Sequence, residues 1–185
     1  MSSSLVGSEM CIRDSNTPTG GDMGAHIVAI DTFIKDFMPN LQINGWSNDW
    51  FGGYPLYYFY FPLPAIITYF LNIVFSFGIA FKIMVVMSTI LVVYSIEKLM
   101  RKTSNQISIY GATAGLFYVF TESFTIYGGN LASTLAGQFS FAYSLAFANL
   151  SIFYLIKSEN NFRFTISSIF LALCLLSHLI PFIIY

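Results

Sequence analysis

The sequence is poor in charged residues. Of its 185 residues, 9% are Asp, Glu, Lys or Arg, whereas soluble globular domains carry roughly 25%. Hydrophobic residues make up 56%, which is more apolar surface than a soluble fold of this size can bury, because much of a small domain stays exposed. This composition excludes a soluble enzyme, a nucleic-acid-binding protein and a disordered linker, and it predicts a membrane protein.

Cysteine and histidine are also scarce. The two cysteines, Cys11 and Cys174, indicate neither a disulfide framework nor a metal cluster, and the net charge of −1 creates no field that would attract nucleic acid. The sequence contains no P-loop, GxSxG, CxxC or HExxH pattern, which argues against an ATPase, a serine hydrolase and a zinc protease.

Residues 5–15, LVGSEMCIRDS, match one reading frame of a transposase-type sequencing adapter. We therefore treat residues 1–15 as a disordered artefact and exclude them from fold reasoning. The chain also stops inside an apolar run at Tyr185. We expect a fragment of a longer protein that starts near Asn16, and we expect the fragment alone to be inactive.

Residues 16–55 form the only long polar stretch and hold four Asp against one Lys. We interpret this stretch as an external acidic loop. Within it, apolar residues recur at i, i+3 and i+4 spacing from residue 25 to residue 37, which predicts a short amphipathic helix. The residues of this apolar face are Ile27, Ile30, Phe33, Ile34 and Phe37.

Four later segments are long and nearly uncharged. About 20 apolar residues in a helix cross the ~30 Å hydrocarbon core of a bilayer. The sequence therefore predicts an all-α, polytopic transmembrane helical bundle. Its spanning helices are expected at 79–98, 106–123, 136–156 and 164–185, the last of them truncated.

Basic residues set the orientation of these helices. Lys98, Arg101 and Lys102 fall in one short connection, and Lys157 and Arg163 flank another. Short loops rich in Lys and Arg stay on the cytoplasmic side. The connection 123–135 and the acidic loop 16–55 are therefore predicted to face outside.

The segment 56–77 is ambiguous. Three prolines in and beside it disfavour a straight helix, and its aromatic cluster is typical of the membrane interface. We favour a re-entrant or interfacial helix on the outer side. The alternative is an ordinary spanning helix kinked by proline.

Three motifs carry a family resemblance. GGDMGAH (20–26), GWSNDWFGGYPLYYFY (45–60) and SFTIYGGNLASTLAGQF (123–139) resemble a family of large prokaryotic membrane proteins labelled "6-pyruvoyl-tetrahydropterin synthase-related domain, membrane protein". The enzymatic part of that label does not suit this chain. A pterin synthase is a soluble zinc enzyme with several His ligands, and only His26 and His178 are present here, far apart.

The layout also resembles the GT-C glycosyltransferases, in which an acidic external loop precedes an aromatic-Pro segment. The elements Asn48-Asp49-Trp50 and Tyr54-Pro55 are similar to a Trp-Asp element and a Tyr-Pro opening in the catalytic subunit of oligosaccharyltransferase. This resemblance implies a sugar donor linked to polyprenyl phosphate. A divalent cation, Mg or Mn, could bridge the donor phosphate to a carboxylate of the acidic loop.

Asp22 and His26 are the candidate catalytic residues. Asp22 lies in a Gly-rich turn whose backbone can approach a ligand closely, and its carboxylate could act as a base or bind a cation. It could equally be an N-cap, because it directly precedes the predicted helix. His26 follows four residues later and could share a helix face with Asp22, orient it or bind phosphate. It could also be an ordinary polar residue on a solvated face.

Six further residues are candidate substrate ligands: Trp46, Asp49, Trp50, Glu122, Asn130 and Gln138. Tryptophan faces stack on sugars, and Asp49 could bind sugar hydroxyls or share a metal with Asp22. The same trio could also be an interfacial anchor. Glu122 could be a second acid or a solvated helix end. Asn130 and its neighbours could bind phosphate or cap a helix.

His178 is a polar group within an apolar run, where an interhelical hydrogen bond or a cavity would satisfy it. Three functions remain open from the sequence. They are a GT-C-like glycosyltransferase in the cell membrane, a lipid or polymer transporter or flippase, and a non-catalytic protein of envelope assembly. The lipid bilayer is the expected partner in each case.

Overall fold

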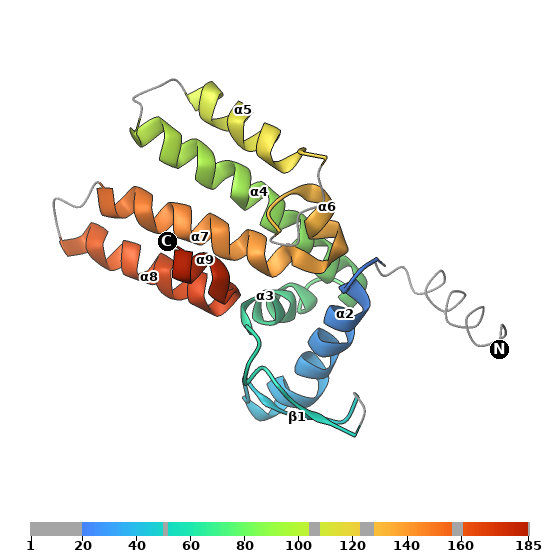
Figure 1. Ribbon diagram of the computed structural model, residues 1–185. Coiled ribbons are helices and arrows are strands. Elements are labelled where there is room, and N and C mark those ends of the chain that lie inside the picture. Colours follow the sequence, from blue (N-terminus) through green and yellow to red (C-terminus); the bar gives the residue numbers. More distant parts are fainter. Residues whose placement is uncertain (1–19, 50–51, 104–107, 123–127, 157–160, 185) are drawn as a thin grey trace.

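The computed structural model describes residues 20–49, 52–103, 108–122, 128–156 and 161–184 (Figure 1). The predicted artefact 1–15 lies outside them. The described residues are mostly helical, as predicted, with one short hairpin. The helices are α2 (Met23–Thr32), α3 (Leu63–Asn72), α4 (Phe77–Thr103), α5 (Ser108–Val119), α6 (Leu131–Ser133), α7 (Phe139–Ile156), α8 (Asn161–Ser177) and α9 (Leu179–Ile184). Two short π-helices are η1 (Phe33–Phe37) and η3 (Thr134–Gln138), and a 3-10 helix is η2 (Met38–Asn40). The strands are β1 (Gly45–Ser47) and β2 (Tyr54–Leu56).

Four long helices lie side by side in the order α5, α4, α7, α8 (Figure 1). The central helix, α7, is buried without interruption from Phe139 to Ser151. Such a helix has no solvent-facing stripe, which explains why its sequence is apolar or small all round.

Polar side chains on α7 are satisfied by the helices on both sides. Asn149 donates to Ser95 Oγ of α4 at 3.1 Å. Ser151 and Ser167 of α8 each donate to the backbone carbonyl of the other, at 3.0 and 2.8 Å. These hydrogen bonds satisfy buried polar groups of α7 and link it to both neighbouring helices.

Two glycines bring α4 and α5 together. A Cβ atom added to Gly111 would lie 2.9 Å from Glu97 Cα, and one added to Gly115 would lie 3.0 Å from Val93 Cα. Glycines four residues apart on an apolar helix are a common contact between membrane helices, because they let the backbones approach closely.

Two helices are long and apolar enough to cross a membrane, Phe77–Lys102 and Leu131–Ile156. Three more apolar helices, at 63–72, 109–119 and 161–177, are shorter than that length. The second long helix begins five residues before the predicted 136–156. It runs from α6 through η3 into α7, with an irregular residue at Gly137 (φ 111°).

The predicted continuous helix 164–185 is wrong, because α8 ends at Ser177 and α9 starts at Leu179. Pro181 explains the break, since it has no N–H to donate and its ring obstructs the carbonyl four residues earlier. Ser144 of α7 donates to the Cys174 carbonyl at 2.9 Å and approaches the His178 carbonyl at 2.8 Å. The backbone carbonyls at the break therefore find a hydrogen-bond donor on α7.

The acidic segment contains both the predicted helix and an unpredicted hairpin. Helix α2 starts at Met23, two residues earlier than expected, and η1 continues it to Phe37. Of its predicted apolar face, Ile30, Phe33 and Phe37 are buried, and Ile27 and Ile34 are partly buried against the same core. Strands β1 and β2 pair antiparallel, with Trp46 opposite Pro55, so the description all-α is corrected by these two short strands.

Candidate functional site

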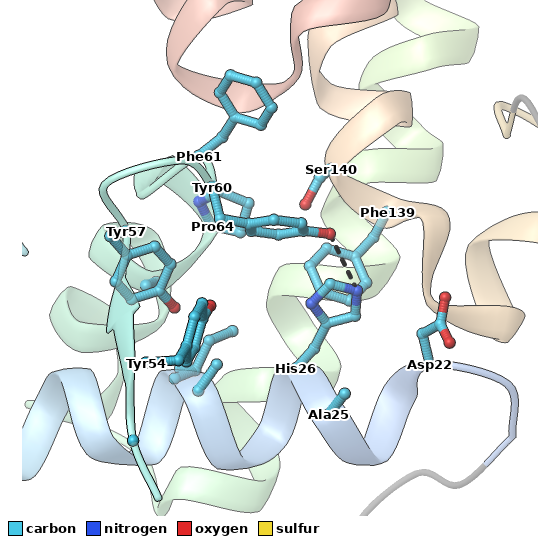
Figure 2. Close-up of a pocket in the computed structure, with 14 residues that line it drawn as sticks. Asp22, Ala25, His26, Tyr54, Tyr57, Tyr60, Phe61, Pro64, Phe139 and Ser140 are labelled. Carbon is cyan, nitrogen blue, oxygen red and sulfur yellow. Dashed lines mark hydrogen bonds between the residues drawn. The ribbon is translucent and has the colours of Figure 1, made fainter. Parts of the chain in front are cut away.

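A cavity of about 500 Å³ opens between α2, the aromatic segment 53–61 and the start of α7 (Figure 2). Its volume lies within the range of small-molecule sites. The lining residues are Asp22, Ala25, His26, Ala29, Ile30, Gly53, Tyr54, Tyr57, Tyr60, Phe61, Pro64, Ala65, Phe139 and Ser140. The two predicted catalytic residues therefore belong to one cavity.

Backbone contacts between two glycine-containing turns place Asp22 at this cavity. The Asp22 N–H donates to the Ala136 carbonyl at 2.8 Å. Gly21 and Gly137 have positive φ angles, 50° and 111°, and a Cβ on Gly137 would lie 3.0 Å from Asp22 Cβ. In the structure, these glycines let one backbone segment approach another. From the sequence, the glycines of the Asp22 turn were expected to let a ligand approach. For Gly21 this is wrong, because Gly21 packs against the backbone of Ala136.

Asp22 occupies the N-cap position of α2, but its side chain makes no capping hydrogen bond. The alternative prediction, that Asp22 is an N-cap, is thus correct for its place in the chain. It is wrong in that the side chain does not cap the helix. The carboxylate is exposed and lines the cavity, where it can meet a ligand.

His26 lies one helical turn beyond Asp22 and points toward Tyr60 (Figure 2). Its Nε2 atom is 3.5 Å from the Tyr60 hydroxyl oxygen, and its ring meets the Phe139 ring edge-on at a centroid distance of 4.8 Å. Burial lowers the pKa of His26, and the charge of Asp22 and the backbone of Gly137 oppose this only in part. The imidazole is therefore neutral near pH 7 and can accept a proton.

Three tyrosines form the other side of the cavity. Burial, with the charge of Asp22 as a smaller cause, raises the pKa of Tyr60 to about 12. Burial also raises the pKa of Tyr57, whose ring packs edge-on against Phe33 at 5.3 Å. These hydroxyls stay protonated at neutral pH, so they offer hydrogen bonds and ring faces to a ligand. Tyr57 has φ 60°, a strained conformation that occurs frequently at functional sites.

Asp49 lies away from this cavity. Its carboxylate accepts hydrogen bonds from the Thr32 hydroxyl and from Ser47 Oγ, and these bonds lower its pKa, with Thr32 the larger cause. Thr32 is ten residues beyond Asp22, and a helix rises 1.5 Å per residue, which separates the two acids by about 15 Å along α2. Asp22 and Asp49 therefore do not share one site.

Among the described residues, the other predicted ligands lie outside the lining. Trp46 is 61% exposed on the hairpin, and Trp50 lies outside the described residues. Glu122 is exposed beyond the end of α5. Gln138 is half-buried and directly precedes Phe139, which does line the cavity.

Asn130 caps a helix, which was one of its two predicted roles. Its Oδ1 atom accepts from the Ser133 N–H at 2.8 Å, and Thr134 Oγ1 donates to the Asn130 carbonyl at 2.9 Å. The His178 ring accepts a local hydrogen bond from the Ile180 N–H at 3.2 Å, and the interhelical bond at this residue goes from Ser144 to the His178 carbonyl. Its ring lies 5.5 Å from that of Phe61, so the helix break adjoins the cavity wall.

Metal ligands are few in this region. Among the described parts of the chain, no three His, Cys, Asp or Glu side chains gather as a group that could hold an ion. The cavity itself offers one carboxylate, Asp22, and one imidazole, His26.

Sequence reasoning missed the aromatic wall and Ser140 as site residues. Tyr54, Tyr57 and Tyr60 were assigned to the membrane interface as part of an aromatic cluster, and Tyr54 was also matched, with Pro55, to the Tyr-Pro opening of oligosaccharyltransferase; Phe139 was not singled out. The available signal was that the three tyrosines and Phe139 fall within two of the three resemblance motifs. Comparison of the chain with protein-family models, curated proteins and solved structures gives no match.

Proposed function

We propose that this chain belongs to a multi-pass protein of the cell membrane that transfers a sugar from a polyprenyl-phosphate donor on the external face, as GT-C glycosyltransferases do. One observation carries the proposal. The three motifs of the family resemblance, at 20–26, 45–60 and 123–139, all contribute to the lining of one cavity. Segments distant in sequence that converge on a concave site with a carboxylate and a neutral imidazole support a catalytic role.

The surface of the bundle supports a membrane location. Ile90 of α4 is 62% exposed and Phe117 of α5 is 75% exposed, and lipid would cover such side chains. We place the two helices that are long enough, Phe77–Lys102 and Leu131–Ile156, across the bilayer, with Lys98 and Arg101 on the cytoplasmic side. Helices α5 and α8 pack against them and are shorter than a full span. Helix α3 has ten residues and rises about 15 Å, half of the hydrocarbon core, which favours the interfacial or re-entrant assignment.

The proposed reaction is a displacement at the anomeric carbon of the donor sugar. His26 accepts the proton of an acceptor hydroxyl, whose oxygen attacks that carbon. The bond between the carbon and the phosphate oxygen breaks, and polyprenyl phosphate leaves. Asp22 stabilises the imidazolium that forms, because it is the one formal charge among the described lining residues.

A divalent cation is compatible with this site. Mg²⁺ is commonly held by one or two carboxylates together with substrate phosphates, and Asp22 supplies one carboxylate. A bound cation would neutralise charge on the donor phosphate. The cation is a proposal that a chelator tests.

A transporter is the second candidate, and the break between α8 and α9 favours it. Transporters use discontinuous helices, usually with the substrate site near the bilayer midplane. Helix α2 and the hairpin pack at one end of the bundle (Figure 1). The cavity is lined by residues of α2, of the segment 53–61 and of the start of α7, a position that favours chemistry at the membrane surface.

One experiment separates the two candidates. The full-length protein is reconstituted in vesicles with a fluorescent polyprenyl-phosphate-linked sugar and membrane extract as a source of acceptors. Glycosyl transfer predicts a labelled product and free polyprenyl phosphate, reduced by chelator if a cation takes part. Movement of the intact donor across the bilayer without cleavage would support the transporter and refute the transferase.

A further inference from the structure

The cavity combines aromatic walls with a single negative charge. Five of its fourteen described lining residues are aromatic, namely Tyr54, Tyr57, Tyr60, Phe61 and Phe139. Asp22 is the acid, and none of the fourteen is Lys or Arg. His26 adds no positive charge near pH 7, because burial lowers its pKa.

The arrangement places the aromatic rings opposite the acid. In Figure 2, Tyr54 and Tyr57 lie on the side away from Asp22, with Tyr60 and His26 between. Aromatic faces carry negative quadrupole density and attract ammonium groups, and a nearby carboxylate adds to the attraction. An ammonium group placed among these residues meets both attractions, and none of the fourteen described lining residues carries a positive charge that would repel it.

We propose that this cavity selects a ligand with an organic ammonium group. The inference rests on the proposed function for the role of that ligand, which is the acceptor. The acceptor is an amino alcohol, or a larger molecule that carries one. Its ammonium group lies among the tyrosine rings, and its hydroxyl reaches His26.

The test uses two small probes of the same shape. Choline is an amino alcohol with a permanent charge, and 3,3-dimethylbutan-1-ol keeps its shape and hydroxyl without the charge. Binding of each to the full-length protein in dodecyl maltoside micelles, which contain no ammonium group, is measured by calorimetry. We expect choline to bind at least tenfold more tightly.

Four variants test which residues of the cavity cause the preference for choline. Tyr60→Leu removes a ring and Asp22→Asn removes the charge, and each should weaken choline binding roughly two- to thirtyfold. Tyr60→Phe keeps the ring face and should bind choline as the wild type does. Asp36→Asn removes an exposed charge elsewhere on the same segment and serves as the control.

The outcomes are separable from those of the transfer experiment. Equal binding of the two probes, or no choline binding by a protein that melts normally, overturns the ammonium site. Glycosyl transfer without choline binding refutes this inference alone. Choline binding without transfer supports the site and refutes the proposed reaction.

Discussion

Asp22→Asn separates a structural role of this residue from a chemical one. Asparagine keeps the size of the side chain and the backbone hydrogen bond from residue 22 to the Ala136 carbonyl. The Asp22 side chain makes no capping bond, and Asn caps about as well as Asp in any case. We therefore expect the free energy of unfolding to change by less than about 0.5 kcal/mol.

The expected effect on rate follows from the spacing of Asp22 and His26. Residues four apart on a helix have Cβ atoms about 6 Å apart, and two unit charges at that distance interact by about 3 kcal/mol at an effective dielectric of 20. Exposure of Asp22 to solvent screens part of this energy. A loss of roughly 10- to 100-fold in kcat is expected.

His26→Gln should cost more, because a general base contributes roughly 10²- to 10⁴-fold. The assay follows sugar transfer by the full-length protein, with melting temperature measured in parallel and Asp36→Asn as the control. A larger loss for Asp22→Asn than for His26→Gln would make Asp22 itself the base. Wild-type kcat in both variants would refute the catalytic pair.

Three further predictions concern folding, pH and topology. Gly137→Ala should lower both the melting temperature and the rate of sugar transfer, because the added Cβ would lie 3.0 Å from Asp22 Cβ and the φ of residue 137 is 111°. Unchanged values would refute the close approach of the two turns. The pKa of His26 in the folded protein lies below that of the unfolded residue, so the unfolded state binds more protons below about pH 6.5. The free energy of unfolding should therefore decrease as the pH is lowered below that value. His26→Gln should reduce that dependence in melting curves, and an identical dependence would contradict the burial of His26. On intact cells, an impermeant thiol reagent should label Asn44→Cys and spare Lys102→Cys in a background without native cysteines, and the reverse pattern would refute the orientation.

The helices could be predicted from the sequence because their signals are local. Charge-free runs and the i, i+3, i+4 spacing of α2 depend only on neighbouring residues, so helices were predicted near their observed positions. The hairpin was not predicted, because strands of three residues give no measurable alternation. The break at His178 could have been predicted, since Pro181 is a local signal that favours it.

The candidate site was predictable only in part. Asp22 and His26 were found because they lie close together in sequence and within one motif. The aromatic wall depends on the packing of residues 53–61 and 139–140 against α2, a tertiary contact that no periodicity encodes. Asp49 was grouped with Asp22 by residue type, whereas the length of α2 separates them.

The central claim is that the donor sugar is bound at the cavity beside Asp22 and His26. A polyprenyl-phosphate-linked sugar with a photoreactive diazirine on the sugar, crosslinked to the full-length protein and mapped by mass spectrometry, tests this directly. Labelled peptides are expected from residues 53–61 and 137–140, with labelling reduced by unmodified donor. Labelling confined to the apolar groove between α4 and α5, at residues such as Ile90 and Leu116, would contradict it.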